Sequence, residues 1–139
     1  MKSNELNEMT VQEACDYAVQ KIVEQGKRCV TIQHGNREMC SYGDGQGNHC
    51  AWGWLVPEDA PDYAELMSAL GTIDELCMEY PHFVDDFNLD TFRALQRFHD
   101  SNQKKLREIE RAELQQCFGI DTSAPQWQAW VDMGIEEDV

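Results

Sequence analysis

The sequence predicts an α+β fold, a mostly helical single domain with a small antiparallel two- or three-stranded sheet. Apolar residues recur at helical spacing in several separate stretches, and residues 28–56 carry a β-branched run bounded by glycine-rich turns. The chain has 139 residues, 42% of them hydrophobic, which is enough for one core without metal or disulfide. We therefore expect one domain over residues 1–139, with frayed tails at 1–9 and 134–139.

The first helix is predicted between Thr10 and Gly26. Thr10-Val-Gln-Glu13 is a capping box, in which each of the two terminal side chains accepts a hydrogen bond from the backbone of the other. Gly26 supplies a left-handed residue that ends the helix. The apolar face comprises Val11, Ala14, Cys15, Ala18, Ile22 and Val23.

The predicted sheet occupies residues 28–56. Residues 29–33 are expected to form one strand, residues 34–36 a turn and residues 39–42 a second strand. Residues 49–55, which end before Pro57, are either a third strand or the first turn of a buried helix, since periodicity cannot distinguish them.

The rest of the chain is predicted to be helical. Residues 63–70 form a short amphipathic helix, and a second capping box at residues 72–75 opens a helix that Pro81 stops. Asn88 is expected to cap a helix with Leu89, Phe92, Leu95 and Phe98 on its apolar face, ending near residues 99–101. The next helix carries Leu106, Ile109, Leu114 and Cys117 up to Gly119, and residues 125–133 form the last helical turns.

Composition restricts the location of the protein. No apolar run approaches the roughly 20 residues of a membrane span, and the N-terminus lacks the apolar segment of a signal peptide. We expect a cytoplasmic protein, in the host cytoplasm if it is viral, that does not bind membranes. Its six cysteines are then reduced, and most are expected to be small buried hydrophobic residues.

Charge is the most informative feature of the chain. Its net charge is -15, and the segment between Arg37 and Arg93 holds twelve carboxylates with no lysine or arginine. Such a segment repels phosphate and attracts basic surfaces, so direct nucleic-acid binding is disfavoured. Six of the eleven bases lie in residues 93–111, which we interpret as a solvated basic face in preference to a phosphate site.

Aromatic residues within the acidic segment suggest a docking face. Aromatic anchors inside a charged rim are typical of protein interfaces, and the alternative, which the pattern favours, is a hydrophobic stripe with solvated acids around it. The candidate binding residues are Glu58, Asp59, Asp62, Glu79, Tyr80, Phe83, Asp85, Asp86 and Phe87.

Two short blocks carry a resemblance to a known group of proteins. They are Cys50-Ala-Trp-Gly-Trp-Leu-Val-Pro57 and Leu95-Gln-Arg-Phe-His-Asp100. The chain resembles small, mostly uncharacterised proteins of tailed phages and prophages, which have a Cys-Ala-x-Gly-x-Leu-x-Pro block and a later Leu-Gln-x-x-His-Asp block. Trp52 and Trp54 are larger than the residues expected there. The resemblance implies a viral or prophage origin and implies no particular reaction.

Cys50, His99 and Asp100 have the residue types of a thiol nucleophile, its base and an orienting carboxylate. Because His99 and Asp100 are adjacent, the orienting group is alternatively Asp44 or Asn48. In the structural interpretation, which we favour, Cys50 belongs to a close-packed segment and Asp100 or Ser101 caps the following helix.

A metal site formed by His34, Cys40, His49 and Cys50 is the other chemical candidate. These are ligand types that zinc accepts, but no Cys-x-x-Cys or His-x-x-x-His pair is present to hold the ion. We therefore expect no metal and no cofactor.

Three hypotheses for function follow. The first is an acidic phage-type binding protein that docks on a basic host protein, such as a nucleic-acid-binding protein, as a mimic or inhibitor. The alternative is a cysteine-dependent hydrolase or transferase using Cys50 and His99. The third is a homodimer in which residues 93–111 meet the acidic segment of a second copy.

Overall fold

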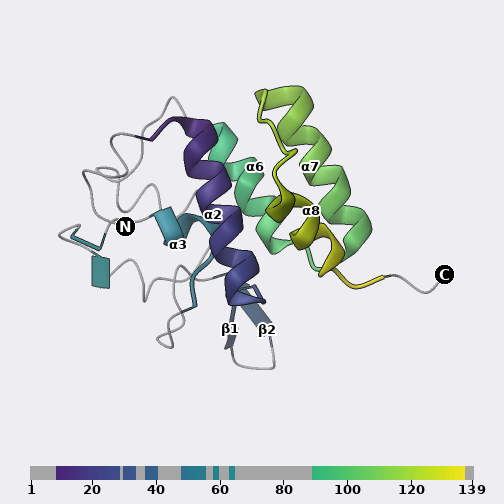
Figure 1. Cartoon of the computed structure of the whole chain (residues 1–139). Helices are drawn as coiled ribbons and strands as arrows, with labels where there is room; N and C mark the ends of the chain where they lie inside the picture. Colours follow the sequence, from purple (N-terminus) through teal and green to yellow (C-terminus); the bar gives the residue numbers. More distant parts are fainter. Residues whose placement is uncertain are drawn as a thin grey trace.

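The computed structural model describes residues 9–28, 30–33, 37–40, 48–55, 58–59, 63–64 and 89–136. The helices of this part are α2 (Val11–Gln25), α3 (Ala51–Leu55), α6 (Leu89–Asp100), α7 (Lys104–Phe118) and α8 (Pro125–Asp132). In Figure 1, α2 lies between α3 on one side and the group of α6, α7 and α8 on the other, and it contacts α3, α6 and α8. None of the helices described is long and apolar enough to cross a bilayer.

The predicted α+β class is wrong. Helices hold most of the described residues, and helical side chains form most of the described core, so this part of the chain is all-α in character. Within the described residues, strands β1 (Val30–Gln33) and β2 (Arg37–Cys40) pair with each other, antiparallel, with Val30 opposite Cys40. They form a short hairpin beyond the end of α2, and none of the described helices packs extensively on it (Figure 1).

Residues 51–55, the candidate third strand, form α3. The N–H of Trp54 donates to the Cys50 carbonyl oxygen at 3.1 Å, which closes a helical turn. The Gln25 side chain accepts from the His49 N–H at 2.7 Å and from the Trp54 indole N–H at 3.1 Å, which fixes this turn against α2. A long-range contact therefore decides between the two local structures that the sequence allowed.

The predicted ends of the first helix are confirmed. The Glu13 N–H donates to the Thr10 hydroxyl at 3.1 Å, and the Thr10 N–H donates to the Glu13 carboxylate at 3.2 Å. Gly26 ends the helix with φ of 81°, and its N–H bonds the Ile22 carbonyl oxygen at 3.0 Å. The buried face consists of Ala14, Cys15, Ala18, Val19 and Ile22.

The core contains two tryptophans of α8. Trp127 and Trp130 are fully buried, and Trp127 lies beside Phe98 with ring centres 5.3 Å apart. The Trp127 indole N–H donates to the Asp16 carboxylate at 2.8 Å, which joins α8 to α2. The Trp130 indole N–H donates to the Phe98 carbonyl oxygen at 3.0 Å, which joins α8 to α6. Both buried rings therefore have their polar group satisfied, as burial requires.

The buried face of α7 differs from the predicted one. Leu106 and Ile109 are 41% and 53% exposed, and Cys117 is exposed as well, whereas Leu114 and Arg107 are buried. Arg107 precedes Leu114 by seven residues, two helical turns, so the two share a face. The apolar pattern predicted the wrong buried face because a charged residue, Arg107, occupies a core position of this helix.

Of the caps predicted for the later helices, one is contradicted and one lies outside the described residues. Gln103 is the N-cap of α7 and its side chain makes no capping bond, so the capping role expected of Asp100 or Ser101 is wrong. The Ser101 hydroxyl instead donates back to the Arg97 carbonyl oxygen at 3.0 Å. Asn88 and residues 65–81 of the helices predicted between residue 63 and Pro81 lie outside the described residues.

Residues 134–136, assigned by sequence to a frayed tail, are attached to the start of α7. The Ile135 N–H donates to the Asn102 carbonyl oxygen at 2.8 Å, and the Lys104 N–H donates to the Ile135 carbonyl oxygen at 2.9 Å. A Cβ on Gly134 would lie 2.6 Å from the Lys104 backbone nitrogen, so only glycine allows this close approach.

Candidate functional site

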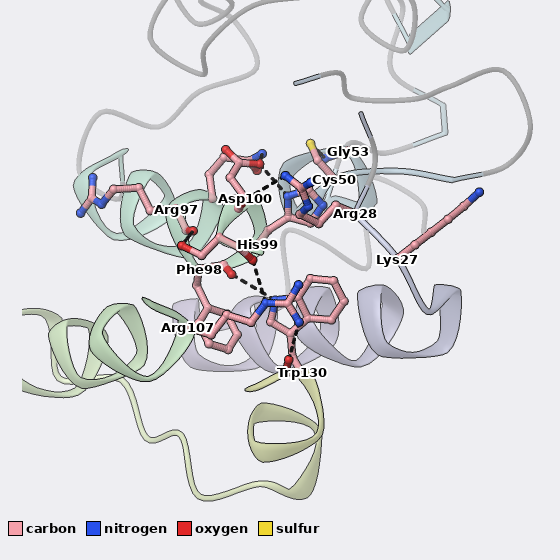
Figure 2. A network of polar contacts seen from close by, with 12 residues as sticks. Lys27, Arg28, Cys50, Gly53, Arg97, Phe98, His99, Asp100, Arg107 and Trp130 are labelled. Atoms are coloured by element: carbon pink, nitrogen blue, oxygen red, sulfur yellow. Dashed lines mark hydrogen bonds and ion pairs between the residues drawn. The ribbon is translucent and has the colours of Figure 1, made fainter. Parts of the chain in front are cut away.

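The predicted triad residues lie at the ends of two helices that contact each other. Cys50 immediately precedes α3, and His99 and Asp100 end α6 (Figure 2). His99 Nδ1 lies 2.8 Å from Asp100 Oδ1, so the adjacent carboxylate does reach the ring and neither Asp44 nor Asn48 is needed to orient it. Gln96 also donates to the same oxygen of Asp100, at 3.1 Å.

Burial argues against nucleophilic chemistry at Cys50. Cys50 and His99 are each 0% exposed, and the Cys50 sulfur accepts a hydrogen bond from the Gly53 N–H at 3.3 Å. A reactive cysteine needs partial exposure to reach a substrate. The full burial of Cys50 agrees with the close-packed segment of the structural interpretation, and the bond from Gly53 to its sulfur lies in the first turn of α3.

The metal candidates are only partly within the described residues. His34 and the side chain of Cys40 lie outside them. His49 lies edge-on to Trp54, with ring centres 4.5 Å apart, and its backbone is bonded to Gln25. Within the part of the chain that the structure describes, no three His, Cys, Asp or Glu side chains gather closely enough to hold an ion.

The candidate docking face also falls largely outside the description. Glu58 and Asp59 are described and exposed, while Asp62, Glu79, Tyr80, Phe83, Asp85, Asp86 and Phe87 lie outside. Burial raises the pKa of Tyr63, and the negative charge of Glu58 adds to this effect.

The bases of residues 93–111 pair with acids of the same helical group. Arg97 Nη2 lies 2.9 Å from Glu113, its Nε lies 3.5 Å from Glu110, and Arg93 lies 2.9 Å from Asp90. Burial raises the pKa of Glu110, and the positive charge of Arg97 opposes that rise.

Lys104 and Arg111 are likewise engaged within this group. Lys104 lies 3.6 Å from both Asp132 and Glu136, and Arg111 donates to the Thr122 hydroxyl and the Gln128 side chain. Arg93, Arg97, Lys104 and Arg111 are thus partnered within residues 89–136, while Arg97 and Lys105 are also exposed to solvent.

Sequence reasoning missed a buried network around Arg107. Arg107 is 4% exposed, and it donates through Nε to the Ser101 carbonyl oxygen at 2.7 Å and through Nη1 to the Trp130 carbonyl oxygen at 2.6 Å. Its guanidinium lies over the Trp130 ring, and the His99 ring lies nearly parallel to that ring with centres 6.0 Å apart (Figure 2). The only signal in the sequence was the two-turn spacing of Arg107 from Leu114.

Arg28 joins this network from the other side. Its Nη1 donates to the Asp100 carbonyl oxygen at 3.0 Å, which links the segment after α2 to the end of α6. Burial, and then the positive charge of Arg28, lower the pKa of Arg107 to about 10. The structure thus brings two arginines together in a chain whose overall charge is strongly negative.

Comparison of the chain with family models, with curated proteins and with solved structures finds no match in any of the three.

Proposed function

We propose that this protein docks on a basic surface of a partner protein and acts through its negative charge, as a nucleic-acid mimic or inhibitor. The contrast between two segments carries the proposal. Residues 38–88 hold eleven carboxylates and no lysine or arginine, whereas residues 89–136 hold eight acids and six bases. Three bases of the second segment pair with acids within it: Arg93 with Asp90, Arg97 with Glu113 and Lys104 with Asp132.

This pairing matters because bases that neutralised the carboxylates of residues 38–88 would cancel the negative potential of that segment. Arg97 and Lys104 have acidic partners within residues 89–136, and residues 38–88 hold eleven carboxylates with no lysine or arginine of their own. A one-sided negative potential speeds encounter with a positive partner and disfavours wrong partners. Carboxylates placed where phosphates would sit compete directly with nucleic acid for lysine and arginine.

The partner class follows from charge and from the resemblance. A nucleic-acid-binding protein offers a groove rich in lysine and arginine, which is complementary to a segment of eleven acids. The likeness to phage and prophage proteins favours a bacterial host protein. Tyr80, Phe83 and Phe87 are the proposed anchors within the acidic rim.

The proposal is tested by capture from a nuclease-treated bacterial lysate on the immobilised protein. We expect basic nucleic-acid-binding proteins to be retained at about 0.05 M sodium chloride and released toward about 0.5 M, because screening shortens the range of exposed charges. Each captured protein is then tested for DNA binding with and without this protein, which should inhibit it. Failure to retain any basic protein at low salt would contradict the proposal.

A cysteine-dependent hydrolase or transferase is the second candidate function. The 2.8 Å contact between His99 Nδ1 and Asp100 Oδ1 favours it, because a base oriented by a carboxylate is what such an enzyme needs. The full burial of Cys50 weighs against it. The reactivity of the Cys50 thiol separates the two functions.

A further inference from the structure

A pocket of about 310 Å³ lies between the end of α2, the connection from α6 to α7 and the segment after α8. Its lining includes Lys27, Arg28, Arg107, Trp130, Met133 and Ile135. All the charged residues of the lining are basic and none is acidic, although the chain has 26 acids and only 11 bases. The charged lining of the pocket is therefore positive, whereas the net charge of the protein is negative.

Arg107 is held in one orientation at this pocket. The carbonyl oxygens of Ser101 and Trp130 take its Nε and Nη1 hydrogens, and the Trp130 ring lies 3.9 Å from its guanidinium carbon. Its Nη2 makes no hydrogen bond with any described residue. A guanidinium fixed by neutral partners keeps its whole positive charge, and it loses little entropy when Nη2 binds an anion.

Arg28 and Lys27 add positive charge near Arg107. The charge of Arg28 acts on Arg107 strongly enough to contribute, after burial, to the lowered pKa of Arg107. The Lys27 side chain extends away from Arg107 in Figure 2, so it adds to the potential without a direct contact. An anion between the two arginines would relieve their repulsion.

The pocket also has exposed apolar lining residues. Met133 and Ile135 line it, and they are 43% and 64% exposed, so they present apolar surface to whatever enters. A pocket near 300 Å³ with a few charged groups and apolar lining residues has the size of a small-molecule site.

We propose that this pocket binds a small organic oxyanion, with its phosphate or carboxylate group at Arg107 and Arg28 and an apolar body against Met133 and Ile135. Arginine suits both head groups because its planar donors match pairs of oxygens. This site is independent of the acidic segment, so the proposal does not depend on docking to a basic partner.

The test uses the full chain and three probes of similar size: phenyl phosphate, benzoate and the neutral benzyl alcohol. Each probe is titrated at constant ionic strength, and binding is measured by calorimetry and by the NMR signal of the Trp130 indole N–H. An anionic probe should show one site. We expect the alcohol to bind at least about tenfold more weakly. The preference between phenyl phosphate and benzoate identifies the head group.

Variants separate a site from general attraction to positive charge. Arg28→Ala should weaken the anionic probe about tenfold and Lys27→Ala less, because the charge of Arg28 acts on Arg107 whereas the Lys27 side chain extends away from it. Lys105→Ala, which removes an exposed base outside the pocket, should leave affinity unchanged.

Met133→Glu tests the pocket without removing an arginine. Met133 is an exposed lining residue, so a carboxylate there should abolish anion binding and leave the fold intact. Ile109→Glu, at an exposed position outside the pocket, is its matched control. Equal binding of the alcohol, no binding of either anion, or equal effects of Met133→Glu and Ile109→Glu would overturn the proposal.

Discussion

The guanidinium carbon of Arg107 lies 3.9 Å from the centre of the Trp130 ring, and Nη1 of the same arginine donates to the Trp130 carbonyl oxygen at 2.6 Å. One side chain therefore contacts both the ring and the backbone of a buried residue on another helix. The second bond of Arg107, to Ser101, adds the connection between α6 and α7. Arg107 therefore connects α7, α8 and the segment between α6 and α7. Its charge is tolerated in the core because these bonds satisfy its Nε and Nη1 donors.

Arg107→Met should lower the free energy of unfolding by about 3 kcal/mol. The substitution keeps much of the apolar side chain, but it leaves the carbonyl oxygens of Ser101 and Trp130 without their donors in a buried place. Urea unfolding measures the difference. Lys105→Met, on the exposed face of the same helix, should change the value by less than about 0.5 kcal/mol. Equal effects of the two substitutions would contradict a structural role of Arg107.

Asp16→Ala should destabilise the contact between α2 and α8 by about 1 to 2 kcal/mol. Asp16 accepts from the buried Trp127 indole N–H at 2.8 Å, and alanine leaves that donor without a partner. A double-mutant cycle with Trp127→Phe measures the coupling, because phenylalanine lacks the N–H. Additive losses for the two substitutions would show that this bond contributes nothing to stability.

Stability should fall in alkaline solution because of Cys15. Burial, and then the charge of Asp16, raise the pKa of Cys15 from 9.0 to about 12, so the folded protein keeps a proton that the unfolded chain loses above pH 9. The unfolded chain then binds fewer protons, and the contribution of Cys15 declines between pH 9 and 12, by at most about 1.4 kcal/mol per pH unit.

Urea unfolding at about pH 8 and about pH 10 measures this decline. Cys15→Ala removes the titrating thiol, so its stability should decline less over the same range. Cys117→Ala removes an exposed thiol and serves as the control, which should keep the decline of the original protein. Equal slopes for Cys15→Ala and the original protein would contradict this assignment.

Iodoacetamide at neutral pH should label Cys117 faster than Cys15 or Cys50. Cys117 is exposed, whereas the other two are buried and need local opening to react. Mass spectrometry of peptides after timed labelling gives the order, and labelling in urea should make the three rates similar. Faster labelling of Cys50 than of Cys117 would instead support the hydrolase or transferase, since it would require an activated and accessible thiol.

Local signals in the sequence predicted structure well, and long-range contacts explain most errors. The capping box of Thr10 and Glu13 and the stop at Gly26 depend on neighbouring residues, so they were recognisable. The choice of helix for residues 51–55 depends on Gln25, which lies far away in the sequence. The buried face of α7 depends on carbonyl groups of Ser101 and Trp130, which no periodicity can reveal.

For the candidate sites too, some features can be recognised in the sequence and others depend on long-range contacts. Adjacency in the sequence disfavours a contact between the His99 ring and the Asp100 carboxylate, yet the carboxylate reaches Nδ1 of the ring. The charge contrast between residues 38–88 and 89–136 could be read from composition alone. The pairing of Arg97 and Lys104 within their own segment could not, because it requires knowing which helices lie together.

Binding to immobilised polyarginine tests the central claim most directly, since this probe offers only positive charge. Two variants that each neutralise three carboxylates are compared as salt rises: Glu58→Gln, Asp59→Asn and Asp62→Asn in one, and Glu108→Gln, Asp121→Asn and Glu136→Gln in the other. We predict that the first variant elutes at clearly lower salt than the second, because the negative field is concentrated in residues 38–88. Elution of both variants at the same salt would show that the charge is evenly spread and would contradict the proposed function.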